Sequence, residues 1–238
     1  MRVFAGPNGS GKTTIFKGIL ADAKIQLGVY VNADDIEKKI LNSNALSFKD
    51  YQLNISDNEI KEFFKKSKFS PIKRNEPELW ALLSVSENVL TILAKIDSYL
   101  AADIAEFIRQ QLLAQGKSFT YETVMSHPGK IDFFHEAQRN GFNVYLYYIA
   151  TEDPEINISR VNVRVAQDGH AVSREVIINR YHKSLQNLKS AIKQTKRAYV
   201  FDNSQKQARL IAEITDGIDV RLNDAFTVPG WVQEYLLN

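Results

Sequence analysis

The 238-residue sequence predicts a three-layer α/β fold built around a parallel sheet. Strand-like and helix-like segments alternate along much of the chain. Residues 144–150 form an apolar run, V-Y-L-Y-Y-I-A, of the kind that is buried on both faces of a parallel sheet. Residues 6–13, G-P-N-G-S-G-K-T, form a glycine-rich loop between a strand-like and a helix-like segment. Ligands bind at the carboxyl ends of the strands in such sheets, so we expect the active site beside this loop.

The first strand and the first helix flank the glycine-rich loop. Residues 3–5 are apolar and end at the loop, which indicates a strand. Residues 14–23 predict an amphipathic helix, because their apolar side chains share one helical stripe: Ile15, Phe16, Ile19 and Leu20. A second strand is predicted over residues 28–32, followed by a short helix over residues 36–41.

The middle of the chain interrupts this alternation. Residues 42–98 include a basic stretch at 61–74 and two prolines, and we expect a mostly helical insertion there. A helix over residues 99–115 and a strand over residues 118–122 then resume the pattern. We therefore predict a single domain over residues 1–238 that carries this insertion.

The last hundred residues continue the alternation of helices and strands. The predicted helices cover residues 130–140, 155–166, 174–195 and 231–237, and the predicted strands cover residues 144–150, 199–202, 209–215 and 218–222. The dipeptide Asp216-Gly217 indicates a two-residue hairpin between the last two strands. The polar loop at residues 167–170 could act as a lid over a bound nucleotide.

Composition excludes several classes of protein. A formal net charge of +2 is too small to indicate nucleic-acid binding, and no apolar run approaches the length of a membrane span. The chain lacks cysteine, and its four histidines include no pair spaced four residues apart. We therefore expect no metal site made of protein ligands alone. The sequence shows no signal peptide, and we expect a cytoplasmic protein.

The glycine-rich loop has the pattern of a phosphate-binding loop, which places the fold in the P-loop NTPase and kinase class. Its glycines let backbone N–H groups turn toward phosphates, Lys12 reaches the β and γ phosphates, and the Thr13 hydroxyl is placed to bind Mg²⁺. We predict that the following residues bind ATP, with GTP as the alternative: Gly6, Pro7, Asn8, Gly9, Ser10, Gly11, Lys12, Thr13 and Thr14.

Asp34 is the candidate general base. It follows the second predicted strand, so it should emerge at the ligand edge of the sheet, where a carboxylate could accept the proton of a hydroxyl that attacks the γ phosphate. This arrangement is typical of a kinase. The alternative is helix capping, and we expect one of the two adjacent residues Asp34 and Asp35 to cap the following helix.

The segment after the third strand of the sheet supplies candidates for acceptor binding. Glu122 ends this strand and could hold a substrate hydroxyl or orient Mg²⁺ through water. The alternative is a salt bridge to Lys12 or a strand-end carboxylate whose hydrogen bonds are satisfied within the fold. Thr123, Ser126 and His127 follow in a loop and suit substrate contacts. His127 could equally be an ordinary surface residue.

Arginines flank the predicted lid. Arg160 and Arg164 lie four residues apart on one face of a predicted helix, and a guanidinium suits the charge that spreads over a transferring phosphoryl group. Arg174 and Arg180 follow the lid. For any one of them the alternative is a solvated helix face.

Two other functions stay open. The strand at residues 199–202 ends in Asp202, which could be the Mg²⁺-binding carboxylate of an ATPase or switch coupled to a protein partner. Asn203 and Ser204 could equally contact the nucleotide base. The basic stretch at residues 61–74 suits a polynucleotide kinase, although such stretches are more often solvated helix faces.

Together these segments resemble the zeta toxins and their relatives, P-loop kinases of bacterial toxin–antitoxin systems, and in particular the chromosomal branch of predicted ATPases. The matching pieces are G-P-N-G-S-G-K-T-T at 6–14, V-N-A-D-D-I at 31–36, F-T-Y-E-T-V-M-S-H-P at 119–128, R-V-N-V-R-V at 160–165, G-H-A-V at 169–172 and Y-V-F-D-N-S at 199–204. They span most of the chain apart from the insertion.

The resemblance implies a mechanism and an acceptor. The better understood members of this family phosphorylate the amino sugar of UDP-N-acetylglucosamine, and an antitoxin protein restrains them. By analogy, Asp34 is the base, Lys12 and Arg164 stabilise the transferred phosphoryl group, and Glu122 with Thr123 holds the substrate.

The chain departs from the family in the lid and in the insertion. His170 stands where the toxins have a second lid arginine, which leaves that role to His170, Arg174 or Arg180. The insertion lies where selectivity for the acceptor would be built, so the family's fold and phosphoryl donor carry over better than its acceptor does.

Overall fold

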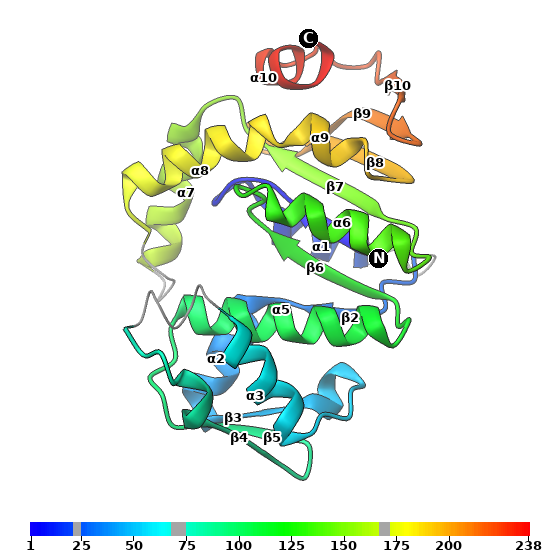
Figure 1. Ribbon diagram of the computed structural model, residues 1–238. Helices are drawn as coiled ribbons and strands as arrows, with labels where there is room; N and C mark the ends of the chain where they lie inside the picture. The colour runs from blue at the N-terminus through cyan, green and yellow to red at the C-terminus, as the bar shows by residue number, and fades with distance from the viewer. Residues whose placement is uncertain (21–24, 68–74, 167–171) are drawn as a thin grey trace. The chain divides into compact units, whose positions relative to one another are not determined.

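The computed structural model describes residues 1–20, 25–67, 75–166 and 172–238 (Figure 1). Contacts divide the chain into two compact units. The first unit comprises Met1–Leu27 and Thr120–Asn238, and the second comprises Gly28–Phe119. The candidate lid at residues 167–170 lies outside the described residues, as does most of the second half of the basic stretch.

A mostly parallel sheet forms the centre of the first unit. Strand β1 (Arg2–Ala5) lies between β6 (Phe119–Thr123) and β7 (Tyr145–Ala150), and β8 (Arg197–Asp202) follows β7. These pairings are parallel. Strands β9 (Arg209–Thr215) and β10 (Asp219–Leu222) extend the sheet beyond β8 in antiparallel pairing. The predicted α/β fold class with a mostly parallel sheet is confirmed.

Helices connect the parallel strands, as Figure 1 shows. Their bounds in the first unit are α1 Lys12–Leu20, α6 Gly129–Arg139, α7 Pro154–Val165, α8 Arg174–Gln186, α9 Leu188–Ile192, α10 Gly230–Val232 and a π-helical turn η3 at Gln233–Leu237. The helix predicted over residues 174–195 is divided at Asn187, whose side-chain amide donates a hydrogen bond to the Met125 carbonyl oxygen at 2.9 Å.

An aromatic ladder fixes the register of the central strands. Phe4 of β1 stacks on Tyr147 of β7 with ring centroids 4.6 Å apart, and Tyr147 stacks on Tyr199 of β8 at 5.0 Å. Phe16 of α1 packs edge-on against Phe4 at 5.2 Å. Because α1 follows the glycine-rich loop directly, this contact also anchors the far side of that loop to β1.

The second unit combines helices with a small antiparallel sheet. Its elements are β2 Val29–Val31, α2 Ala33–Ser43, β3 Ala45–Ser47, η1 Phe48–Tyr51, α3 Asp57–Lys66, η2 Leu79–Leu82, β4 Leu83–Ser86, β5 Val89–Ile92 and α5 Ser98–Ala114. The strand order in the small sheet is β3-β5-β4. Phe107 of α5 lies in the aromatic core, where its ring contacts those of Phe48 and Phe63 at 5.9 and 5.3 Å.

The prediction of a mostly helical insertion over residues 42–98 is wrong for its last third, which contains the β4–β5 hairpin. Glu87 and Asn88 both have positive φ, at 50° and 66°, so the two strands are joined by a two-residue turn of type I′. The alternation of apolar and polar residues from Leu83 to Ile92 is a strand pattern. The predicted hairpin at Asp216-Gly217 forms, and both residues have positive φ. Its connection has three residues rather than the predicted two, because Thr215 pairs with Asp219.

Candidate active site

The phosphate-binding loop follows β1 and leads into α1. At Gly6 the backbone φ is +143°, and a Cβ atom would lie 1.9 Å from the carbonyl oxygen of Ile149. At Gly9 φ is +75°, and a Cβ atom would lie 2.5 Å from the carbonyl oxygen of Asn157. Only glycine fits this backbone, as the sequence motif predicts.

Two asparagine side chains hold the loop from outside. The fully buried amide of Asn157, on α7, donates a hydrogen bond to the Asn8 carbonyl oxygen at 2.5 Å, and its own oxygen accepts one from the Thr151 hydroxyl. The amide of Asn203, after β8, donates to the Ser10 carbonyl oxygen at 2.7 Å. Because its carbonyl groups are tied back in this way, the loop keeps one conformation.

Lys12 folds over the loop. Its ammonium group donates hydrogen bonds to the carbonyl oxygens of Gly6 and Pro7, each at 2.9 Å. The buried Asn8 Oδ1 and Ser10 Oγ atoms lack a hydrogen-bond partner among the described residues. Lys12 thus places a cation at the loop, where the motif predicts phosphate oxygens.

Thr13 and Glu122 meet at the end of the sheet. The Thr13 hydroxyl, at the start of α1, donates a hydrogen bond to Glu122 Oε2, on β6, at 3.0 Å. Hydroxyl and carboxylate oxygens suit Mg²⁺, which takes few protein ligands when it also binds substrate phosphates. This contact places Glu122 beside Thr13, and its role in binding Mg²⁺ or substrate stays a prediction.

The loop after β6 uses its polar groups locally. The Thr123 hydroxyl accepts a hydrogen bond from the Met125 backbone at 3.2 Å, and His127 Nδ1 accepts one from the Gly129 backbone at 3.1 Å. Ser126 is half-buried in the same loop. Substrate contacts by these residues stay predictions, and the bond to Gly129 gives His127 a structural role at the start of α6.

The arginines divide into two groups. Arg160 and Arg164 follow Asn157 on α7 by three and seven residues, so they share the face of the helix that contacts the loop. Arg160 Nη1 is buried without a hydrogen-bond partner among the described residues, whereas Arg164 is exposed. Arg174 instead forms a bidentate ion pair with Glu155, and these hydrogen bonds raise the pKa of Arg174.

Asp202 belongs to a structural network rather than to an open metal position. Its buried carboxylate accepts hydrogen bonds from the Trp231 indole at 3.2 Å and the Ser204 hydroxyl at 2.6 Å. Ser204 Oγ also accepts from the Glu152 backbone N–H at 2.8 Å. The C-terminal segment is thereby tied to the sheet. Asn203 contacts the loop backbone, a different contact from the nucleotide base that the sequence suggests for it.

Asp34 lies in the first turn of α2, in the second unit. The cap of this helix is Asn32, whose side-chain oxygen accepts a hydrogen bond from the Asp34 backbone N–H at 2.8 Å. The prediction that Asp34 or Asp35 caps the helix is therefore wrong. The exposed carboxylate of Asp34 makes no ion pair or side-chain hydrogen bond with the described residues, so the fold leaves it available for chemistry.

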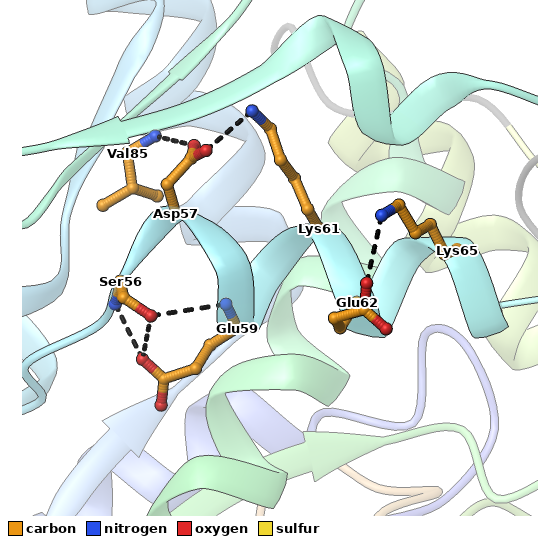
Figure 2. Close-up of polar contacts among 7 residues, drawn as sticks. All are labelled: Ser56, Asp57, Glu59, Lys61, Glu62, Lys65 and Val85. Carbon is orange, nitrogen blue, oxygen red and sulfur yellow. Dashed lines mark hydrogen bonds and ion pairs between the residues drawn. The ribbon is translucent and has the colours of Figure 1, made fainter.

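The described part of the basic stretch pairs its charges locally (Figure 2). On α3, Lys61 bonds Asp57 at 2.7 Å and Lys65 bonds Glu62 at 3.0 Å. Ser56 begins the helix with a capping box to Glu59. These contacts are those of a solvated, self-neutralised helix face, which gives little support to a polynucleotide kinase.

No helix within residues 1–20, 25–67, 75–166 and 172–238 is both long and apolar enough to cross a membrane. Over the same ranges no group of three or more histidine and carboxylate side chains is arranged to hold a metal ion.

Comparison with known families identifies one match. The zeta toxin family model matches residues 95–213, half of the chain. An uncharacterized protein of Haemophilus influenzae is 33% identical over 69 residues, which cover 29% of this chain and 49% of that protein. The chain thus spans about half the length of this curated relative.

Solved structures share the fold at low identity. The complex of AvrRxo1-ORF1 with AvrRxo1-ORF2, with sulphate ions, matches with a TM-score of 0.54 and 16% identity over 94% of this chain and 60% of that one. A structure of the same complex with ATP gives 0.51 and 14% over the same shares. The PezAT chromosomal toxin–antitoxin system of Streptococcus pneumoniae gives 0.52 and 13%, covering 100% of this chain and 78% of that one.

Sequence reasoning missed two residues that the site depends on. Asn157 straps the loop, and Asn32 caps α2 beside the candidate base. Asn32 stands directly before the first helical residue, which is a readable capping signal. Asn157 lies inside a helical pattern, and no local signal distinguishes it from a solvated polar residue.

Proposed function

Because the chain belongs to the zeta toxin family, we propose that it is a kinase that transfers the γ-phosphoryl group of ATP, or of GTP as the alternative, to a sugar hydroxyl. The proposed acceptor is a nucleotide sugar such as UDP-N-acetylglucosamine. The observation that carries this proposal is the strapped phosphate-binding loop, with Lys12 at its centre and Thr13 in contact with Glu122 at the adjacent strand end.

The donor binds to the first unit in this account. Residues from Gly6 to Thr14 bind the phosphates through backbone N–H groups, and Lys12 exchanges its bonds to loop carbonyls for bonds to phosphate oxygens. Thr13 and Glu122 would hold Mg²⁺, which when bound neutralises charge on the phosphates. Asn203 acts on the donor indirectly, by holding the Ser10 carbonyl oxygen.

Asp34 is the base in this account. Its carboxylate takes the proton of the acceptor hydroxyl while the hydroxyl oxygen forms a bond to the γ phosphorus. The bond from that phosphorus to the bridging oxygen breaks, and ADP leaves with the electron pair. Because neither a cap nor an ion pair among the described residues occupies the Asp34 carboxylate, the base is ready to accept a proton.

Arginines and polar loop residues complete the proposed site. Arg160 and Arg164 stabilise the charge on the transferred group, because they continue the loop-facing side of α7. The proposed acceptor contacts come from Glu122, Thr123, Ser126, His127, His170 and Arg174. Within this set Arg174 is the least supported, because it already pairs with Glu155. His170, Arg174 and Arg180 stay alternatives for the second lid arginine of the family.

An antitoxin is the proposed protein partner. The PezAT neighbour is a toxin–antitoxin system, and the AvrRxo1-ORF1 structures are complexes with a second protein. We expect this chain likewise to be restrained by a protein encoded beside it.

The test incubates the purified protein with ATP, Mg²⁺ and a panel of nucleotide sugars and nucleosides, and measures added phosphoryl groups by mass spectrometry. We expect a phosphorylated nucleotide sugar, and we expect Asp34→Asn to reduce the rate of transfer by roughly 10²- to 10⁴-fold because it removes a general base. ATP hydrolysis without any phosphorylated acceptor would contradict the kinase proposal and favour the partner-coupled ATPase.

A further inference from the structure

A polar cavity of about 340 Å³ lies wholly within the second unit, along one face of α2. It is lined by Tyr30, Asn32, Asp35, Lys38, Lys39, Asn42, Asp50 and Tyr51. The residues that α2 contributes stand at positions 35, 38, 39 and 42, which is the i, i+3, i+4, i+7 spacing of a single helix face. The volume is within the range of small-molecule sites.

One wall of this cavity is already fixed by its own contacts. Lys39 forms an ion pair with Asp50 at 2.9 Å and lies over the ring of Tyr51, 5.5 Å from its centroid. Tyr51 is buried, and burial together with the carboxylates of Asp50 and Asp35 raises its pKa, so it stays a neutral phenol. This wall presents a rigid aromatic surface with no net charge.

The other wall offers side chains that the fold does not use. Asp35, Lys38 and Asn42 are exposed and form no side-chain hydrogen bond or ion pair with the described residues. Together they supply one cation, one anion and one amide. The lining therefore carries two positive and two negative charges in all, which disfavours a ligand that is highly charged at this point.

A chain of hydrogen bonds links the cavity to the proposed base. The Asn32 amide donates to the Tyr30 hydroxyl at 2.8 Å, and the Asn32 oxygen accepts from the Asp34 backbone N–H at 2.8 Å. Lys38 stands one helical turn after Asp34, a separation of about 6 Å along the helix. Asp35, the residue next to Asp34, also lines the cavity, so the cavity begins beside the candidate base.

We propose that this cavity binds the uncharged, hydroxyl-rich ring of the phosphoryl acceptor, with Asp35 and Asn42 bonding the ring hydroxyls that do not react. This inference rests on the proposed function, because it assigns the acceptor of the same reaction. A sugar ring presents hydroxyl donors, oxygen acceptors and an apolar face. The Asp35 carboxylate can accept from the donors, the Asn42 amide can donate to the acceptors, and the tyrosine rings can pack against the apolar face.

The test measures binding of two probes, UDP-N-acetylglucosamine and UDP, by isothermal titration calorimetry. UDP lacks the N-acetylglucosamine residue, that is, the sugar ring with its acetamido group, and has a free terminal phosphate in its place. We expect the wild type to bind the sugar-bearing probe more tightly, and we expect Asp35→Ala and Asn42→Ala each to weaken that binding roughly tenfold by removing a hydrogen bond to the ring. Binding of UDP and of ATP should change less than about twofold in these variants.

A matched control is Lys66→Ala, an exposed residue of the second unit outside the cavity. It should leave all three affinities unchanged, and thermal unfolding should show that every variant folds. The inference is overturned if the wild type binds both probes equally, or if the cavity variants weaken UDP as much as UDP-N-acetylglucosamine. Sugar-dependent binding without phosphoryl transfer would instead contradict the proposed function while leaving the cavity assignment in place.

Discussion

The phosphate-binding loop and helix α2 hold their functional groups in opposite ways. The loop in the first unit presents backbone atoms, and buried amides from Asn157 and Asn203 fix it from behind. Helix α2 in the second unit presents exposed side chains, Asp34 and Asp35 among them, on a regular backbone. Under the proposed function, we therefore expect donor binding to depend on backbone conformation, and acceptor binding to depend on which side chains the helix carries.

This difference predicts which amino-acid substitutions each region tolerates. A substitution that moves the loop backbone should damage folding and nucleotide binding together, because the loop touches the buried residues behind it. A substitution on the exposed face of α2 should alter the reaction and leave stability intact. The variants that follow test the contrast, beginning with the largest expected effect.

The first variant, Gly6→Ala, breaks the loop backbone. The new Cβ would lie 1.9 Å from the Ile149 carbonyl oxygen, and the residue would be held at φ +143°. We expect the free energy of unfolding to fall by about 3 kcal/mol or more, with ATP binding lost. Chemical denaturation and calorimetry measure the two effects. Gly18→Ala, in α1 with open space around it, is the control and should stabilise the protein by about 0.5–1 kcal/mol.

Asn157→Ala removes one strap without touching the loop sequence. It leaves the Asn8 carbonyl oxygen without its amide donor, and it removes the nearer of the two acceptors of the Thr151 hydroxyl. We expect the free energy of unfolding to fall by about 2 kcal/mol, and ATP affinity to fall roughly tenfold because the loop is less well ordered. Asn162→Ala, an exposed position on the same helix, should change neither quantity. Unchanged ATP affinity in Asn157→Ala would show that the strap is structural only.

Trp231→Phe tests whether the hydrogen bonds of Asp202 contribute to stability without affecting ATP binding. The change removes the indole N–H that donates to the buried Asp202 carboxylate, which keeps its bond from Ser204. We expect the free energy of unfolding to fall by about 1–2 kcal/mol, with ATP affinity unchanged. Thermal unfolding and nucleotide titration together decide this. Loss of nucleotide binding would instead favour Asp202 as the Mg²⁺-binding carboxylate of an ATPase.

The smallest expected effect is that of Asp57→Asn in the second unit. Hydrogen bonds from Lys61 and from the Val85 backbone lower the pKa of the Asp57 carboxyl group. A lowered folded-state pKa stabilises the fold above the unfolded-state pKa, and this stabilisation is lost as the pH falls through the folded-state pKa. Wild type should exceed the variant by about 0.5 kcal/mol in free energy of unfolding at pH 7. In urea titrations, the difference in free energy of unfolding between wild type and variant should shrink toward pH 3. A difference that persists at pH 3 would show that the Asp57 carboxylate is not its source.

The sequence predicted the loop and the central strands well because both have local signals. The motif requires glycine at the positions where the backbone has positive φ, and residues 144–150 are apolar enough to need burial on both faces. The β4–β5 hairpin was missed although it alternates correctly, because Glu87-Asn88 is an unusual pair for a type I′ turn.

The rest of the candidate site depends on tertiary contacts. The role of Asn157 is defined by an Asn8 carbonyl oxygen that is 149 residues away, and the ion pair of Arg174 depends on how α7 packs against α8. No spacing in the sequence encodes either contact. The cavity on α2 combines one helix face with Tyr30, Asp50 and Tyr51 from neighbouring segments, so its chemistry can be read only after folding.

The central claim is that donor and acceptor functions are held by different regions, and the most direct test is the affinity for ATP in Mg²⁺ buffer. Calorimetry would compare wild type with Asp34→Asn, Asp35→Ala and Asn157→Ala. We predict that the two α2 variants bind ATP as tightly as wild type, whereas Asn157→Ala binds roughly tenfold more weakly. Equal weakening in the α2 variants and in Asn157→Ala would contradict the separation of the two functions.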